Sequence, residues 1–155
     1  MLLYLLRHAN ADTPAPADDD RELSKKGFEE AAEVGRFCKT HKIRPELILT
    51  SPLRRAHATA LAVAEAVGGE LVVTPWLSSG MEPQTAVKEL QGFRSRESVM
   101  IAGHEPDFSK LAAHLLGLPT PTAIHIRKAS LTALELPLFR AGAACLEFSI
   151  PCKLM

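Results

Sequence analysis

The chain has 155 residues with 18 basic and 18 acidic side chains, so its formal net charge at neutral pH is zero. This balance excludes a global field that would favour nucleic acid or an anionic membrane surface. The length is typical of one domain, and no apolar run approaches the roughly 20 residues that span a bilayer. We therefore expect a single domain over residues 1–155, with no nucleic-acid or membrane partner.

The cysteines and the first residues bear on cellular location. The N-terminus lacks the order of basic, apolar and small residues found in a signal peptide, which predicts a cytoplasmic location. Cys38, Cys145 and Cys152 are odd in number and lack paired metal-ligand spacing. We expect reduced thiols, with Cys145 and Cys152 buried separately, and we expect no metal and no cofactor. A neutral chain without a conspicuous apolar surface run also predicts a monomer.

The first predicted strand ends on two polar side chains. Residues 2–6 form an apolar run, and Arg7 and His8 follow it directly. Ligands of open α/β sheets bind beyond the carboxyl ends of the strands, so a histidine beside a fixed cation could act there as a nucleophile toward a phosphoryl group. The alternative is a strand that simply ends in solvent. Residues 9–22, rich in Ala, Asp and Pro, then predict an irregular surface loop.

Two helices are predicted in the first half of the chain. Ser24 is a candidate N-cap for a helix that runs to about residue 42. Ser51 and Pro52 are typical of an N-cap and a first helical residue, and the glycine pair 68–69 ends this second helix. The apolar stripe expected on the first helix is Phe28, Ala31, Ala32, Gly35 and Cys38. The stripe expected on the second is Leu53, Ala56, Ala60, Val63, Ala64 and Val67.

The remaining elements complete an alternating pattern. Further strands are predicted over residues 46–50, 71–74 and 98–102. Further helices are predicted over residues 83–93 and from Pro106 to Gly117, the latter with a stripe of Phe108, Leu111, Ala112 and Leu115. Two strand-like runs in the tail, 130–136 and 145–150, predict an edge hairpin. The fold class is therefore α/β: a three-layer α/β/α sandwich with a mainly parallel central sheet and an antiparallel edge strand near the C-terminus.

Parallel strands would bring several polar residues to one edge of this sheet. Those that follow three of the strands are Arg7–His8, Thr50–Ser51 with Arg54–Arg55, and Gly103–His104. Arg54 and Arg55 fall in the first turn of a helix, where free N–H groups and the helix dipole favour an anion. They project about 100° apart, so we expect them to differ in role. Separately, an arginine here could lie in solvent and His104 could be structural; their convergence points instead to an anion site.

Three motifs, in this order, resemble the histidine phosphatase superfamily, which also contains the phosphoglycerate mutases. They are Arg7-His8-Ala9, Ser51-Pro52-Leu53-Arg54-Arg55-Ala56 with Thr59-Ala60, and Gly103-His104-Glu105-Pro106. The short length, Glu22-Leu23-Ser24 with Gly27, and the closing Pro151-Cys152-Lys153-Leu154 resemble its small SixA-type phosphohistidine phosphatase branch. The resemblance covers almost the whole chain and implies a phosphoglycerate mutase-like fold.

The resemblance also implies a division of roles. His8 is the nucleophile that becomes transiently phosphorylated, and Arg7, Arg55 and His104 form the rest of the phosphate pocket. In the family pattern the arginine directly before the alanine belongs to the pocket, which selects Arg55 over Arg54. The resulting reaction is two in-line phosphoryl transfers, to the imidazole and then to water, with side-chain cations in place of a metal.

Three further residues complete the comparison with the family pattern. Arg21 matches an arginine near the phosphate in the small branch, and we also expect Ser51 to bind substrate. Ala9 stands where the superfamily usually has glycine. This departure would matter only if the backbone there needed positive φ or a very close approach.

The leaving group decides between substrates. The resemblance implies that the small branch lacks the usual carboxylic acid, and a protonated phosphoramidate releases imidazole far more easily than an ester releases an alkoxide. Glu82 and Glu105 are the candidate acids, and the alternative is that they are an ordinary loop carboxylate and a helix-start carboxylate. Three functions follow: a phosphatase of phosphohistidine on a signalling or phosphocarrier protein, a phosphatase of a small phosphorylated metabolite, or a catalytically silent phosphate-binding module.

Overall fold

Strands and helices alternate along the chain in the predicted order. The computed structural model describes residues 1–12 and 17–155. Its strands are β1 (Leu2–Arg7), β2 (Leu47–Thr50), β3 (Glu70–Val73), β4 (Ser98–Gly103), β5 (Leu131–Glu135) and β6 (Cys145–Ile150). Its α-helices are α1 (Lys25–Thr40), α2 (Arg54–Val67), α3 (Pro83–Gln91) and α4 (Asp107–Leu116). Short 3₁₀ helices are η1 (Asp18–Asp20), η2 (Pro75–Leu77), η3 (Pro121–Ala123) and η4 (Cys152–Leu154).

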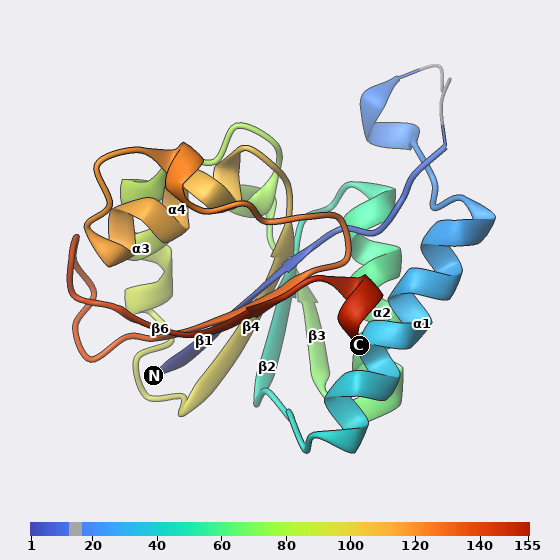
Figure 1. Ribbon diagram of the computed structural model, residues 1–155, viewed down its shortest axis with the longest axis horizontal. Coiled ribbons are helices and arrows are strands. Elements are labelled where there is room, and N and C mark those ends of the chain that lie inside the picture. Colours follow the sequence, from blue (N-terminus) through green and yellow to red (C-terminus); the bar gives the residue numbers. More distant parts are fainter. Residues whose placement is uncertain (13–16) are drawn as a thin grey trace.

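The strands form one sheet in the order β3-β2-β4-β1-β5-β6 (Figure 1). β1, β2, β3 and β4 pair in parallel, whereas β5 pairs antiparallel with β1, and β6 antiparallel with β5. Helices α1 and α2 cover one face, and α3 and α4 cover the other. The predicted three-layer α/β/α architecture, with its antiparallel edge near the C-terminus, is confirmed.

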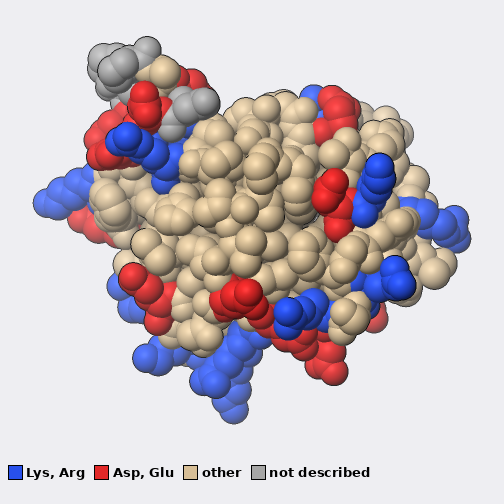
Figure 2. Space-filling model, turned by 180° about the vertical axis from the view of Figure 1, so that it is seen from behind, with Lys and Arg blue, Asp and Glu red and all other residues tan. Residues whose placement is uncertain are grey.

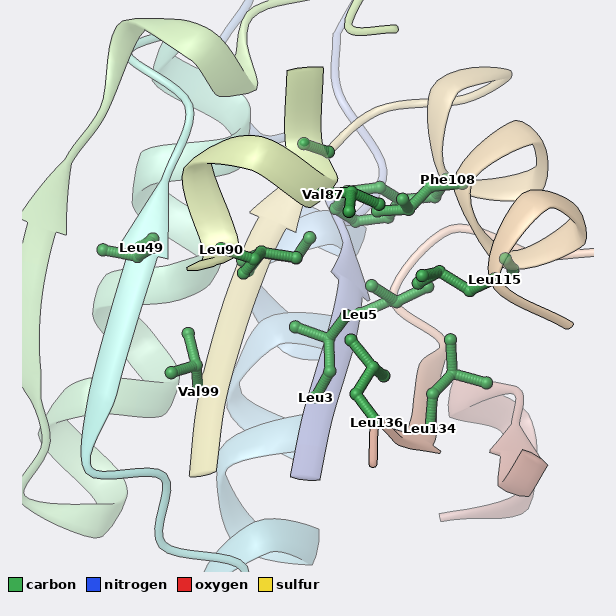
Figure 3. Close-up of a cluster of buried hydrophobic side chains, with 14 of the residues drawn as sticks. Leu3, Leu5, Leu49, Val87, Leu90, Val99, Phe108, Leu115, Leu134 and Leu136 are labelled. Atoms are coloured by element: carbon green, nitrogen blue, oxygen red, sulfur yellow. The ribbon is translucent and has the colours of Figure 1, made fainter. Parts of the chain in front are cut away.

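The apolar run of β1 is divided between two cores. Leu3 and Leu5 pack in the cluster under α3 and α4, which also contains Phe108 (Figure 3). Tyr4 and Leu6 face the other way, into the cluster under α1 and α2. Burying one such leucine side chain contributes about 1.5–3 kcal/mol. Because both faces of β1 are buried, its carboxyl end is fixed in the middle of the sheet.

The predicted buried stripe of α1 is confirmed in part, since Ala31, Gly35 and Cys38 are buried. Phe28 is 58% exposed and Ala32 is also exposed, so these two members of the expected stripe are wrong. The position of the helix is set by Gly27, where an added Cβ would lie 1.9 Å from the carbonyl oxygen of Asn10. That backbone contact turns a different set inward: Gly27, Ala31, Val34, Gly35 and Cys38.

Helix α2 begins three residues later than the predicted N-cap. Its N-cap is Leu53, and Arg54 is its first residue. The hydroxyl of Ser51 does not cap the helix. It accepts a hydrogen bond from the Leu53 amide at 3.2 Å and lies 2.9 Å from Nε2 of His104. The prediction of Ser51 as the N-cap was wrong, because its hydroxyl pairs with the buried His104, which is distant in sequence and so not part of the local pattern.

The predicted loop over residues 9–22 contains more order than expected. Ala11 forms a bridge with Leu23, and η1 lies between them. Residues 13–16 of this loop lie outside the described residues. The bridge joins the two ends of the loop, and η1 lies close to α2, where Asp18 accepts from Arg55.

The surface shows both signs of charge. On the rear face, lysines and arginines occur near aspartates and glutamates around the margins, and a broad area in the upper centre carries neither (Figure 2). Cys38, Cys145 and Cys152 are free thiols in the described structure, but Cys145 is exposed, so its predicted burial is wrong. None of the helices in residues 1–12 and 17–155 has the length and apolar character needed to cross a membrane.

Candidate active site

Three neighbouring strands end at the same place and bring polar residues together. His8 follows β1, Ser51 follows β2, and His104 follows β4. The ladder continues through this point, since the His8 amide donates to the Gly103 carbonyl at 3.0 Å and the Ser51 amide donates to Ala102 at 3.0 Å. The rings of His8 and His104 lie 5.3 Å apart between centroids. The structure thus assembles both histidines at the carboxyl edge of the sheet.

His8 is a buried, neutral imidazole. The pKa of His8 is lowered from 6.5 to about 3; burial is the largest cause, a hydrogen bond to Ala9 opposes it, and the nearby His104, Arg55 and Arg7 contribute to the lowering. That bond runs from Nδ1 to the Ala9 carbonyl oxygen at 2.8 Å. A carbonyl oxygen only accepts, so the single ring proton lies on Nδ1. The lone pair is therefore on Nε2, the nitrogen that could attack an electrophile.

Ala9 fits its position without strain. Its amide donates to Thr59 Oγ1 at 3.0 Å, and that hydroxyl donates to the Arg55 carbonyl at 2.7 Å. Among the non-glycine residues that the structure describes, positive φ occurs at Lys42 and Ala129 only. The backbone at Ala9 therefore does not require the glycine usual in the superfamily. Thr59 lies in one of the sequence motifs, but the sequence analysis gave it no role. Through these two hydrogen bonds it joins the residue after β1 to the first turn of α2.

The three arginines near the strand ends have different environments. Arg55 is only 4% exposed and donates to the carbonyl and the carboxylate of Asp18 at 2.6 and 2.8 Å. Arg7 is half-buried, and its Nη1 donates to the Ile126 carbonyl at 2.8 Å. The side chain of Arg54 is 59% exposed and forms an ion pair with Glu22 at 2.9 Å. The structure thus directs Arg55 inward and Arg54 outward, as expected from their angular separation on a helix.

His104 is also held neutral. The pKa of His104 is lowered from 6.5 to about 4; burial is the largest cause, Arg55 and Arg7 act in the same direction, and Asp18 opposes them. Its Nε2 faces the buried hydroxyl of Ser51. Ser51 therefore lies beside His104 and can fix its tautomer, and the substrate contact expected for Ser51 stays a prediction.

Three buried nitrogen atoms of this site lack a partner within the described residues. They are Nε of Arg7, Nε of Arg55 and Nδ1 of His104, which is a donor when Nε2 accepts from the Ser51 hydroxyl. A buried polar group without a hydrogen bond costs about 1–3 kcal/mol, and proteins rarely leave such groups together without a reason. An oxyanion with several acceptor oxygens would satisfy all three. The arrangement is that of a small anion site beside the lone pair of His8.

Asp18 connects two arginines at the edge of the site. Its two carboxylate oxygens accept from Arg21 at 3.1 Å and from Arg55 at 2.8 Å. The hydrogen bond from Arg21 is the main cause of the lowered pKa of Asp18, and Arg55 adds to it. Arg21 also donates to the carbonyls of Asp12 and Ala11. Arg21 is thus linked to Arg55 through Asp18. The sequence analysis did not identify Asp18. The pattern that could have indicated it is the run of three aspartates directly before Arg21.

The two candidate acids lie in ordinary surroundings. Both carboxylate oxygens of Glu105 are occupied by Ser109, whose amide and hydroxyl donate at 3.1 and 2.7 Å. Glu82 is exposed at the start of α3, and its side chain forms no hydrogen bond with another described residue. The nearby loop is held instead by Asp107, which accepts from the Gly80 and Met81 amides.

The chain is similar to proteins of known family and fold. The family model "Histidine phosphatase superfamily (branch 1)" matches residues 3–78. An uncharacterized protein of Picosynechococcus is 30% identical over 155 residues, covering 95% of this chain and 89% of the relative. Phosphohistidine phosphatase SixA of Escherichia coli K12 is 27% identical over 125 residues, 78% of each chain. The solved structure of a protein histidine phosphatase SixA complexed with tungstate has a TM-score of 0.89 at 23% identity, with 99% of this chain and 98% of that chain covered. The predicted phosphoglycerate mutase-like fold is confirmed.

Proposed function

The chain belongs to the histidine phosphatase superfamily, and from that premise we propose that it removes phosphoryl groups from phosphohistidine on a protein. The substrate is a signalling or phosphocarrier protein of the cytoplasm, and the reaction passes through a phosphorylated His8. The observation that carries this proposal is the neutral, buried His8, whose Nε2 lone pair lies beside unpartnered donors of Arg7, Arg55 and His104.

In the first step, Nε2 of His8 attacks the phosphorus of the substrate. A bond forms between this nitrogen and phosphorus, and the bond from phosphorus to the substrate imidazole breaks, leaving its electron pair on that imidazole. Because the substrate's other ring nitrogen carries a proton, the leaving group departs as neutral imidazole. Arg7, Arg55 and His104 donate to the phosphoryl oxygens, which stabilises the charge spread over them in the transition state.

In the second step, water attacks phosphorus on the opposite side from His8. The electron pair of the bond between phosphorus and Nε2 returns to the imidazole, the water loses its protons to solvent and phosphate, and inorganic phosphate is released. His8 is regenerated as the neutral tautomer that its bond to the Ala9 carbonyl favours. The guanidinium groups supply the positive charge that this chemistry needs, so we propose a metal-independent reaction.

The surroundings of the carboxylates support a phosphohistidine substrate over a phosphate ester. An alkoxide leaving group requires a proton, and such an acid must be free to donate it. The carboxylate of Glu105 is engaged by Ser109, and no hydrogen bond to a described residue holds the exposed carboxylate of Glu82 at the site. A leaving group that departs as neutral imidazole needs neither. The name of the Escherichia coli relative, a phosphohistidine phosphatase, agrees with this choice.

The test is a comparison of substrates. The protein is incubated with a phosphohistidine-bearing protein, with free phosphohistidine and with a panel of phosphate monoesters, each with and without EDTA. We expect turnover of phosphohistidine that survives EDTA and exceeds turnover of the monoesters. Rapid hydrolysis of monoesters together with inert phosphohistidine would instead assign the protein to small phosphorylated metabolites. No turnover of any substrate, with phosphate still bound, would mark a silent binding module.

The role of His8 is tested by trapping the intermediate. Rapid acid-free quenching of the wild-type protein should yield an acid-labile phosphoenzyme. The His8→Ala variant should form no phosphoenzyme, and its kcat should be lower by at least about 10⁴-fold. His41→Ala, at the exposed end of α1, is the matched histidine control and should keep the phosphoenzyme. Retained turnover in the His8 variant would show that another group attacks phosphorus.

A further inference from the structure

A cavity of about 380 Å³ adjoins the phosphate pocket, and Lys and Arg make up half of the residues that line it. We call it the basic trough, and its charged residues are Arg7, Lys26, Glu30, Arg127, Lys128 and Lys153. Arg7 belongs both to this trough and to the site beside His8. In Figure 1 the segment between η3 and β5 passes in front of the sheet toward η4, and these two segments supply three of the cations.

The positive charge of the trough is largely uncompensated. Its carboxylate, Glu30, accepts from the Asn10 amide at 2.9 Å and lies 3.8 Å from Lys26. Arg127, Lys128 and Lys153 form no ion pair with any acidic group that the structure describes. The chain as a whole has zero formal charge. A local excess of cations therefore marks this face, and it is not a consequence of a basic protein.

The trough has a fixed position relative to the nucleophile. Nη1 of Arg7 donates to the Ile126 carbonyl at 2.8 Å, next to Arg127. The Ala129 amide lies 3.2 Å from the carbonyl oxygens of both Arg7 and His8, so the turn that carries Arg127 and Lys128 is bonded to the end of β1. A ligand that lies in the trough is thereby placed at a set distance from His8.

Building on the proposed function, we propose that the basic trough binds acidic side chains that flank the phosphohistidine of the protein substrate. The phosphoryl group itself is satisfied by the donors around His8, so these further cations serve a second set of anions. Lysine and arginine at an open rim attract carboxylates over several ångströms without a rigid geometry, which suits variable acidic residues of a partner. Their contribution is to capture of the substrate, so it should appear in KM and in salt dependence.

The test uses paired peptides and paired variants. One phosphohistidine peptide is flanked by four glutamates and the other by four glutamines. At low salt the wild-type protein should prefer the acidic peptide by about ten-fold in kcat/KM, mostly through KM, and 0.5 M salt should remove most of this preference. The triple variant R127E/K128E/K153E should lose the preference. The control K39E/K88E/R94E changes the net charge equally at exposed sites outside the trough and should keep it.

A second readout separates this inference from the proposed function. The same two peptides are made with a non-hydrolysable phosphoryl-triazole in place of phosphohistidine. Their binding to the wild-type protein, the trough variant and the control variant is measured by calorimetric titration. Tighter binding of the acidic peptide by about ten-fold, lost only in the trough variant, supports the trough even if turnover fails. Equal binding of both peptides to the wild-type protein overturns the inference, and so does an equal loss in the control variant. If the protein hydrolyses neither the two peptides nor free phosphohistidine, the proposed function is overturned, but the inference about the trough is not.

Discussion

The buried and exposed parts of the site are held by different interactions. We call the site floor the buried residues His8, Ser51, Thr59 and His104. We call the site rim the ion-paired residues Asp18, Arg21, Glu22 and Arg54. The floor is bonded to backbone and hydroxyl groups at the ends of β1, β2 and β4, whereas the rim lies on the β1–α1 loop and the outer side of α2.

The difference shows which part of the site is set in advance and which can exchange partners. A buried hydrogen bond cannot be replaced by water, so the floor keeps its tautomers and distances before any substrate arrives. Ion pairs between exposed side chains contribute at most about 1 kcal/mol, so a stronger anion can displace them. Arg55 connects the two parts, because its carbonyl accepts from Thr59 and its guanidinium donates to Asp18.

After the loss of His8, the largest effect should follow from removing the guanidinium that joins floor and rim. Arg55→Ala should lower kcat/KM for phosphohistidine by about 10²–10³-fold, as expected for losing one donor to the charge of a transition state. The control is Arg54→Ala, which changes the neighbouring arginine, whose side chain is 59% exposed. This variant should lower kcat/KM by at most about five-fold. Steady-state kinetics of both variants measure the difference. Equal losses would show that the inward and outward arginines act together, contrary to the geometry.

The floor should also make stability fall in mild acid. The pKa values of His8 and His104 are about 3 and 4 in the folded protein, against about 6.5 for an unfolded histidine. Below pH 6.5 the unfolded chain therefore binds protons that the folded protein does not. Between pH 7 and pH 5 each imidazole should cost about 2 kcal/mol of unfolding free energy, with little further loss below the folded pKa.

Urea unfolding at several pH values tests this effect, with a His8→Gln/His104→Gln double variant as the reference. The fall in unfolding free energy from pH 7 to pH 5 should be smaller in the double variant by the contribution of both imidazoles. An identical pH dependence in the two proteins would mean that the two histidines have the same pKa in the folded and the unfolded state. Phosphate, which favours positive charge in the site, must be left out of the buffer.

Much of the floor could be predicted from sequence because it depends on local patterns and one topological rule. The apolar run before Arg7 is long enough to mark a strand buried on both faces. Parallel strands bring their carboxyl ends together, which placed His8 near His104 without any knowledge of packing. The angular separation of adjacent helical residues distinguished the roles of Arg54 and Arg55, and the structure agrees with the expected difference in direction.

Other features depend on contacts that no local pattern contains. The Ser51 hydroxyl faces His104, which is 53 residues away in sequence, so its pattern wrongly predicted a helix cap. The face of α1 depends on the close approach of Gly27 to the Asn10 backbone, which turned Phe28 outward. The pairing of Asp18 with Arg55 spans 37 residues and joins a surface loop to a helix. Such pairings require the folded arrangement.

A moderate loss of stability should follow from cutting the bond that joins β1 to α2 within the floor. Thr59→Val keeps the shape of the side chain but leaves the buried Ala9 amide without its acceptor. Leaving such a donor unpaired should lower the unfolding free energy by about 1–3 kcal/mol. Thr59→Ser keeps the hydroxyl and serves as the control, with a loss limited to one methyl group. Equal losses in the two variants would place the contribution of Thr59 in packing and not in this hydrogen bond.

The smallest expected effect tests whether the rim yields to an anion. The Asp18 carboxylate occupies donors of Arg21 and Arg55, so a phosphoryl group that uses Arg55 must compete with it. Asp18→Asn should therefore strengthen inhibition by inorganic phosphate about two- to five-fold at low salt, the range expected for an ion pair whose carboxylate is exposed. Asp12→Asn is the matched control, because only the backbone carbonyl of Asp12 bonds to Arg21. Weaker phosphate inhibition in the Asp18 variant would show that this carboxylate positions Arg55 for the ligand, and the rim would then belong with the floor as a part of the site that is set in advance.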